Sequence, residues 1–160
     1  MTVMASNEEN LRRSGIVLPE LPSPAGLYCP GIRVGDLIYT SGQLPLAGGK
    51  LIEPGGRGCV SAASEQDATI AARTAALNAV AVLRSVAESL DAVAGIVKLT
   101  VYVSSAEGFT NQHKVANGAS ELVGEIFAES GQHVRSAVGV TSLPLDASVE
   151  IEMIAYCPIK

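Results

Sequence analysis

Hydrophobic and polar positions predict a chain in which strands and helices alternate. Residues 64–90 carry apolar side chains at the spacing of an amphipathic helix, and Ser64 with Asp67 resembles a capping box at its start. The buried side of this helix is expected to hold Ile70, Leu77, Val80, Ala81 and Leu90. A second helix is predicted over residues 110–129, ahead of Gly131. Its buried side is expected to hold Ala116, Ala119, Val123 and either Ile126 or Phe127.

The segments around these helices have the composition and alternation of strands. The predicted strands span residues 27–29, 37–41, 95–104, 135–140 and 149–156. Gly35-Asp36 would turn the first pair, and the Leu-Pro turn at residues 142–146 would make the last two strands neighbours. Along residues 95–104, one face would be formed by Val97, Leu99, Val101 and Val103.

This order predicts an α+β fold, a two-layer sandwich of one mixed β-sheet with two helices on one face. No segment remains to cover the other face of the sheet. On that face the final strand would place Glu150, Glu152, Ile154 and Tyr156. Such a half-polar face fits an oligomer with clefts between subunits. Residues 25–160 are expected to form a single domain, and residues 1–24 an extension with a short helix at 6–14 and a proline-rich connector.

Residues 47–58 contain five glycines and predict a loop with a short hairpin at Gly48-Gly49. The spacing of these glycines fits neither of the phosphate-binding patterns GxGxxG and GxxxxGK(S/T). We therefore interpret the segment as a structural or interface loop. Asn78, on the first long helix, is expected to be a structural amide, with a ligand contact as the alternative. Three cysteines without metal-ligand spacing are expected to be free thiols in a reducing compartment.

The overall composition restricts the possible partners. Hydrophobic residues make up 48% of the chain and the mean hydropathy is +0.31, which suggests that part of the apolar surface is buried between subunits. The net charge of −5 without a basic stripe argues against nucleic acid or an anionic membrane as partner. No apolar run reaches the roughly 18 residues of a membrane span, and the first residues do not resemble a signal peptide, so a cytoplasmic location is expected.

Arg135 and Glu150 carry the candidate chemistry. An arginine fork can clamp a carboxylate with two parallel hydrogen bonds, and a nearby glutamate can handle a proton or orient a water. A site for a small carboxylic acid is therefore predicted, with an inter-subunit salt bridge as the alternative role of Arg135. Glu152 is expected at an interface or in solvent, and His133 on the surface of a loop. Ser41 has no visible His/Asp partners for serine-hydrolase chemistry.

Four separated segments form a recognisable pattern. They are Tyr28, the run Tyr39-Thr40-Ser41-Gly42-Gln43-Leu44-Pro45, the run Arg135-Ser136-Ala137-Val138, and Leu143-Pro144 followed by Val149-Glu150-Ile151-Glu152. Together they resemble the RidA/YjgF enamine/imine deaminase family, in the same order and with matching element lengths from about Ala25 to Tyr156. The first residues, the glycine-rich loop and residues 108–120 resemble a distinct branch of that family.

The resemblance implies a chorismate-mutase-like fold and a homotrimer with sites in clefts between subunits. It implies hydrolysis of reactive enamines, in their imine form, to 2-keto acids and ammonia, with no metal or organic cofactor. By motif match, Arg135 would clamp the substrate carboxylate and Glu150 would orient or activate the attacking water. Tyr28 would line the cleft from its strand, while Ser41 and Gly42 would contribute a hydroxyl and backbone amides.

Two positions depart from the deaminase pattern. Ala137 stands where the deaminases usually carry a cysteine, and His113 falls where an asparagine is expected, flanked by Asn111 and Asn117. These changes would reshape the pocket and leave the Arg–Glu pair intact. One alternative function is a non-catalytic trimer that binds a 2-keto acid or a related small carboxylate, and a stress-related holdase is a third. The acidic net charge argues against the ribonuclease role attached to some relatives.

Overall fold

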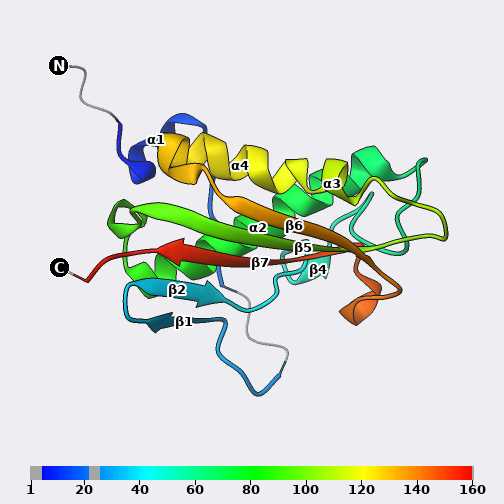
Figure 1. Cartoon of the computed structure of the whole chain (residues 1–160), viewed down its shortest axis with the longest axis horizontal. Helices are drawn as coiled ribbons and strands as arrows, with labels where there is room; N and C mark the ends of the chain where they lie inside the picture. The colour runs from blue at the N-terminus through cyan, green and yellow to red at the C-terminus, as the bar shows by residue number, and fades with distance from the viewer. Residues whose placement is uncertain (1–4, 22–25, 160) are drawn as a thin grey trace.

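The computed structural model of the chain describes residues 5–21 and 26–159. These residues form a five-stranded mixed sheet with a layer of helices on one face (Figure 1), which confirms the predicted α+β class. The strands of the sheet are β1 (Gly31–Val34), β2 (Leu37–Thr40), β5 (Gly95–Ser104), β6 (Val134–Val140) and β7 (Val149–Tyr156). Their order across the sheet is β1-β2-β7-β5-β6, and only β5 and β6 run parallel.

The last two strands are not neighbours, so the predicted pairing of residues 135–140 with residues 149–156 is wrong. A parallel pair needs a long crossover, and the helices between β5 and β6 provide one, so β6 pairs with β5. β7 then pairs antiparallel with the other edge of β5. The segment between β6 and β7, which includes the short 3₁₀ helix η3 (Pro144–Asp146), therefore passes the end of β5.

The first strand lies later in the chain than predicted. β1 begins at Gly31, so residues 27–29 lie outside the sheet, whereas the turn at Gly35-Asp36 is confirmed. A second, two-stranded sheet is the hairpin of β3 (Leu46–Ala47) and β4 (Lys50–Leu51). Its turn residues Gly48 and Gly49 have φ angles of 58° and 78°, which glycine adopts without the steric penalty that other residues meet.

The helical layer consists mainly of α2 (Glu65–Ala87) and α4 (Asn117–Phe127). The second predicted helix begins as the single turn α3 (Gln112–Val115), continues as α4, and ends in the 3₁₀ turn η2 (Ala128–Gly131). Its predicted buried residues are confirmed. By length and composition α2 could cross a membrane, but 61% of its most apolar window is buried inside the fold, as is typical of a core helix.

Val80 and Ala81 are buried as predicted, but much of the rest of the buried face of α2 is formed by alanines that the sequence pattern did not single out. They are Ala68, Ala71, Ala72, Ala75, Ala76 and Ala79. Ile70 is 51% exposed, and Leu90 lies beyond the helix in the 3₁₀ turn η1 (Leu90–Ala92). A Cβ on Gly118 of α4 would lie 3.0 Å from the carbonyl carbon of Thr69 and closer still to its oxygen. Small residues on both helices therefore allow this close approach.

The predicted capping box at the start of α2 is wrong. The Ser64 hydroxyl accepts a hydrogen bond from the backbone N–H of Ser61 at 3.0 Å and none from the helix. It therefore closes the turn ahead of the helix. Asn78 has the structural role expected of it, because its Nδ2 donates to the carbonyls of Leu44 and Leu46 at 2.9 and 3.0 Å.

The glycine-rich loop braces the chain just ahead of β7. The Gly58 N–H donates to the carbonyl of Asp146 at 2.7 Å, and the Ser148 N–H donates to the carbonyl of Gly56 at 3.0 Å. A Cβ on Gly55 would lie 2.7 Å from Cβ of Asp67, so the loop passes too close to α2 for a larger residue. These contacts support the interpretation of a structural loop.

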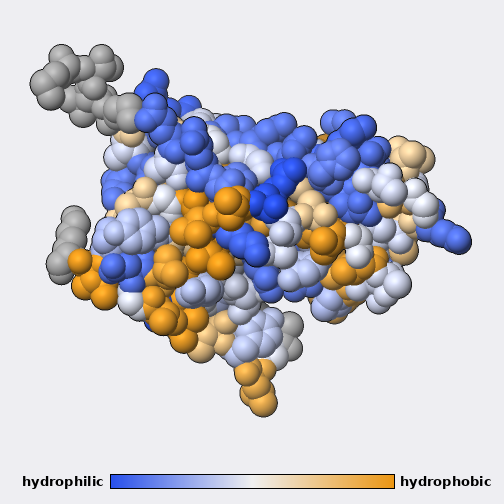
Figure 2. Space-filling view, viewed as in Figure 1, coloured by the Kyte–Doolittle hydropathy of each residue, from blue (hydrophilic) through white to orange (hydrophobic). Residues whose placement is uncertain are grey.

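The described residues leave the second face of the sheet uncovered. Figure 1 is viewed from this side, with the sheet in front of α2, and Figure 2 shows an apolar band across it. The exposed apolar residues of the strands are Ile32, Val34, Tyr39, Val97, Val134, Val138 and Tyr156. Val97 departs from the face that it was predicted to share with Leu99, Val101 and Val103, because a register shift between Ile96 and Lys98 interrupts the alternation.

The N-terminal helix α1 (Asn7–Arg13) lies against the helical layer. Ser6 caps it, and Leu11 is buried. Asn7 donates to the carbonyls of Leu90 and Val93, and Asn10 donates to the carbonyl of Ile126. Side-chain amides that bond backbone carbonyls of the domain thus fix this short helix in place.

Candidate functional site

Arg135 lies on the edge strand β6 and faces the helices. It is paired with Leu99 in the parallel register, and directly paired residues share one face of a sheet. Its Nη1 donates to Oδ1 of Asn117 at 3.0 Å and to Oγ of Ser120 at 2.9 Å, and its Nη2 donates to the carbonyl of His113 at 2.9 Å. The first turn of α4 and a backbone carbonyl of α3 thus hold the guanidinium in one orientation.

The three oxygens that hold this guanidinium are all neutral. Within residues 5–21 and 26–159, Arg135 forms no ion pair with a carboxylate. Burial lowers the pKa of Arg135 from its ordinary value, although arginine stays charged in proteins. The three bonds occupy three of its five N–H donors and leave one on Nη2 and that on Nε. Adjacent donors of this kind suit a bidentate carboxylate.

Glu150 lies on β7, on the uncovered face, opposite Tyr102 of β5. Burial raises the pKa of the Glu150 carboxyl, and the neighbouring Glu152 carboxylate raises it further. The side chain lies directly against the backbone of Gly42, because a Cβ there would be 2.8 Å from Cδ of Glu150 and closer still to Oε1. Glycine at this position therefore makes room for the carboxyl group.

Glu152 was expected in solvent or at an interface, but it has a hydrogen-bond partner within the chain. The Tyr102 hydroxyl donates to Oε2 of Glu152 at 3.3 Å. Burial raises the pKa of Tyr102, and so does the Glu152 carboxylate. Tyr102 thus orients one carboxylate beside Glu150. The available signal in the sequence was its place on the polar face of the alternating strand.

Arg135 and Glu150 lie on opposite faces of the sheet, so one chain does not bring them together as the sequence predicted. Arg135 shares its face with Leu99 and the helices, while Glu150 pairs with Tyr102 on the uncovered face. The side chains of neighbouring residues alternate along a strand, and β5 separates β6 from β7. A site that uses both groups has to combine the two faces.

The segments that carry Ser41 and Tyr28, which were also expected in the cleft, are hydrogen-bonded to each other. Ser41 donates its hydroxyl to the carbonyl of Cys29 at 2.6 Å, and its N–H donates to the carbonyl of Pro30 at 2.7 Å. Tyr28 is 50% exposed and lies on an irregular segment rather than on a strand. The Ser41 hydroxyl therefore fixes the segment that carries Tyr28.

The remaining candidates have different surroundings. The His113 side chain is exposed, and only its carbonyl contacts Arg135. Ala137 pairs with Val101 and packs against the core. His133 is half-buried rather than on a loop surface, because its ring contacts Ser120 and the Gly131 carbonyl.

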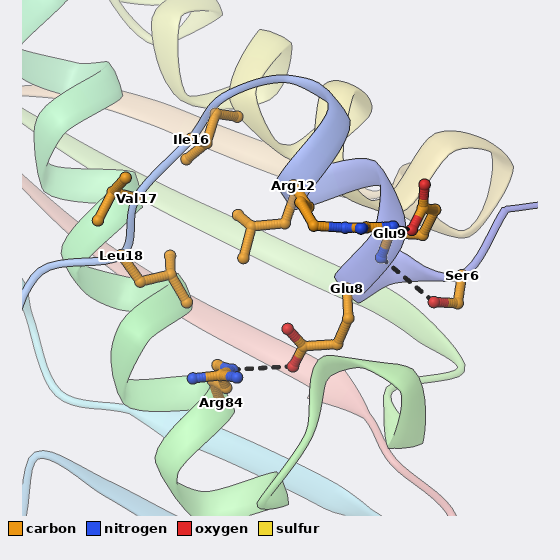
Figure 3. A pocket seen from close by; sticks show the side chains of 9 residues that line it. Ser6, Glu8, Glu9, Arg12, Ile16, Val17, Leu18 and Arg84 are labelled. Carbon is orange, nitrogen blue, oxygen red and sulfur yellow. Dashed lines mark hydrogen bonds and ion pairs between the residues drawn. The ribbon is translucent and has the colours of Figure 1, made fainter.

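A hollow of about 570 Å³ lies elsewhere, between α1, the connector after it, and α2 (Figure 3). Apolar side chains and two ion pairs surround it, Glu8 with Arg84 at 2.8 Å and Glu9 with Arg12. No candidate site residue lines it. Among residues 5–21 and 26–159 no group of three His, Cys, Asp or Glu side chains could hold a metal ion, and the cysteines are free thiols.

Comparison with known proteins identifies the family of the chain. Residues 19–157 match the family Endoribonuclease L-PSP. The chain is 41% identical to Protein TCP17 of Trypanosoma cruzi, over 95% of this chain and 96% of that protein. It is 30% identical to the 2-iminobutanoate/2-iminopropanoate deaminase of Salmonella typhimurium, over 88% of this chain and 94% of that enzyme.

Solved structures show the same fold. The protein Atu1372 of unknown function from Agrobacterium tumefaciens is 35% identical, with a TM-score of 0.84 over 96% of this chain and 92% of that one. The E. coli YjgF gene product is 26% identical, with a TM-score of 0.56 over 87% of this chain and 96% of that one. E. coli TdcF with bound serine is 28% identical, with a TM-score of 0.59 over 85% and 92%. The chain therefore belongs to the Endoribonuclease L-PSP family, which is the RidA/YjgF family.

Proposed function

We propose that this protein hydrolyses small carboxylate-bearing enamine/imine intermediates to 2-keto acids and ammonia, at clefts between the subunits of a homotrimer. The observation that carries the proposal is Arg135, a half-buried guanidinium held by neutral oxygens with two donors free in the described part of the chain. A desolvated cation of this kind is stabilised by an anion, and its donors match a substrate carboxylate. Relatives named 2-iminobutanoate/2-iminopropanoate deaminase support the reaction.

The chemistry needs only modest help from the protein. Water adds to the electrophilic imine carbon, and the resulting carbinolamine loses ammonia. The nitrogen gains two hydrogens, both from the water, while the water oxygen becomes the carbonyl of the keto acid. Glu150 takes one proton from the attacking water and passes it to the imine nitrogen, and then takes the hydroxyl proton of the carbinolamine and passes it to the departing amine. A raised pKa suits a carboxyl group that has to accept a proton in one step and donate it in the next.

The separation of the two groups supports a site between subunits. Arg135 faces the helices at the β6 edge, and Glu150 lies on the uncovered face. In our proposal the Arg135 edge of one subunit meets the Glu150 and Gly42 region of its neighbour. The apolar band on the uncovered face would be buried in the same assembly, which removes an exposed patch that a monomer would carry.

A coupled assay tests the proposal. An amino-acid oxidase or a threonine dehydratase generates imines in solution, and the release of keto acid is compared with the spontaneous rate. We expect acceleration by the wild type and its loss in Arg135→Ala and Glu150→Gln. Arg13→Ala, at an exposed position on α1, is the matched control for losing an arginine. Sedimentation velocity reports the assembly of each variant.

Each outcome has a definite meaning. Acceleration that both site variants abolish, with an unchanged sedimentation coefficient, supports an imine deaminase. Absence of acceleration for every imine, with the trimer intact, refutes the catalytic proposal and favours the alternative of a small-carboxylate-binding protein. A monomer in solution would contradict the site between subunits.

A further inference from the structure

A chain of hydrogen bonds starts at Nη1 of Arg135, whereas the two free donors of the guanidinium are on Nε and Nη2. Nη1 of Arg135 donates to Oγ of Ser120 at 2.9 Å, and Oγ of Ser120 lies 2.9 Å from Nε2 of His133. Nδ1 of His133 lies 2.6 Å from the carbonyl oxygen of Gly131. Neither Ser120 nor His133 takes part in the proposed reaction.

The direction of these bonds follows from the chemistry of each group. A carbonyl only accepts, so Nδ1 of His133 carries the hydrogen that Gly131 receives. Nε2 of the neutral ring is then an acceptor, and the Ser120 hydroxyl donates to it. This bond points the Ser120 hydrogen away from Arg135 and leaves an oxygen lone pair for Nη1. All three bonds thus donate in one direction and reinforce one another.

We infer that His133 is a positioning residue that acts through Ser120 to fix the guanidinium of Arg135 for a ligand carboxylate. The inference rests on the proposed function of Arg135. Without His133 the Ser120 hydroxyl is free to rotate, and its hydrogen then competes with that of Nη1. Asn117, the other side chain that holds Nη1, is exposed, so Ser120 is the more sheltered of the two. His133 therefore sets the orientation of Nε and Nη2 without contacting the ligand.

The test is a double-mutant cycle on imine turnover. Ser120→Ala and His133→Leu should each raise KM about five-fold and leave kcat nearly unchanged, because a freed arginine side chain weakens ground-state and transition-state binding alike. The double variant should be no worse than Ser120→Ala, since His133 acts through that hydroxyl. His133→Gln should restore KM, because its amide oxygen can accept from Ser120. A purely structural role of His133 would give additive losses, and additive losses would overturn the inference.

Two controls match the changes in residue type. Ser130→Ala removes a hydroxyl that bonds only the carbonyl of Phe127 at 2.7 Å among the described residues, and Gln132→Leu adds the same leucine at the exposed neighbouring position. Both should retain the KM of the wild type. If either raised KM as much as the two network variants, the effect would not be specific to the network, and the inference would be wrong.

A second measurement does not depend on turnover. In the ¹⁵N NMR spectrum of the wild type, the two Nη atoms of a guanidinium held by hydrogen bonds should give separate signals for Arg135. The signals should merge in Ser120→Ala and His133→Leu and separate again in His133→Gln. Unchanged Arg135 signals in His133→Leu would overturn the inference, whether or not the protein turns over imines. Merged signals without any turnover would support the inference while the proposed function fails.

Discussion

Gly42→Ala is a single substitution that should displace Glu150 at the candidate site. The new Cβ would lie 2.8 Å from Cδ and 3.0 Å from Cγ of Glu150. Ordinary carbon contacts are about 3.5–4.0 Å, so the carboxyl group has to move by about 1 Å or more. All three of the nearest atoms belong to one flexible side chain, and the backbone of Gly42 does not have a positive φ. The clash should therefore displace Glu150 and leave the fold intact.

The expected result is a separation of activity from stability. A misplacement of about 1 Å at a catalytic group costs about 100-fold in rate, so imine turnover should fall by about that factor. The free energy of unfolding should change by less than about 1 kcal/mol, because a side chain rather than the backbone absorbs the clash. Turnover is measured in the coupled assay, and stability by urea denaturation monitored by circular dichroism.

Gly124→Ala is the matched control, because Gly124 lies on the exposed side of α4 with open space around its Cβ position. It should keep full activity and gain up to about 1 kcal/mol of stability from the better helix propensity of alanine. Wild-type turnover in Gly42→Ala would refute the role of Glu150. A loss of several kcal/mol in that variant would refute the argument that the side chain absorbs the clash.

Three further predictions concern stability. The raised folded-state pKa of Glu150 means that its neutral form stabilises the fold; this contribution is fully present below the unfolded pKa of about 4.3 and is lost as pH rises through the folded value. Glu150→Gln should therefore be more stable than the wild type at about pH 7.5 and match it at about pH 4 in thermal unfolding. Gly118→Ala should cost about 1–3 kcal/mol in urea denaturation, because its Cβ meets the backbone of Thr69. Arg73→Gln should cost at most about 1 kcal/mol, less at high salt, because the Arg73–Glu125 pair at 2.7 Å is partly exposed.

Sequence patterns predicted the bounds of the strands better than they predicted which strands pair in the sheet. Residues 95–104 and 149–156 match β5 and β7 at both ends, because strict alternation marks a half-buried strand. The order of the strands depends on long-range pairing. The Leu-Pro turn at residues 142–146 resembles a hairpin connection, yet β5 lies between the strands it joins. Local turn chemistry does not determine which edge of a sheet is free.

The candidate site was also predicted only in part. Residue type and the family pattern singled out Arg135 and Glu150, and both are half-buried charged groups with shifted pKa values. Most of the groups around them were missed, although Asn117, which holds Arg135, flanks the position where the deaminase pattern has an asparagine. Ser120 is an ordinary helical serine in the sequence, and Tyr102 an ordinary strand residue. Their roles depend on contacts between α4 and β6 and between β5 and β7, which only the fold brings about.

The placement of Arg135 and Glu150 on opposite faces links the proposed activity to assembly. Within one chain the sheet separates the two groups. The proposed site therefore needs both side chains and a second subunit that brings them together. A monomer would retain both side chains, including their hydrogen bonds and desolvation, and would still lack a cleft that contains them together. In the proposed homotrimer, variants that weaken subunit contacts on the uncovered face should therefore lose turnover in proportion to the loss of the oligomer, while Arg135 itself remains in place in each subunit. This coupling distinguishes a site between subunits from one that a single chain completes.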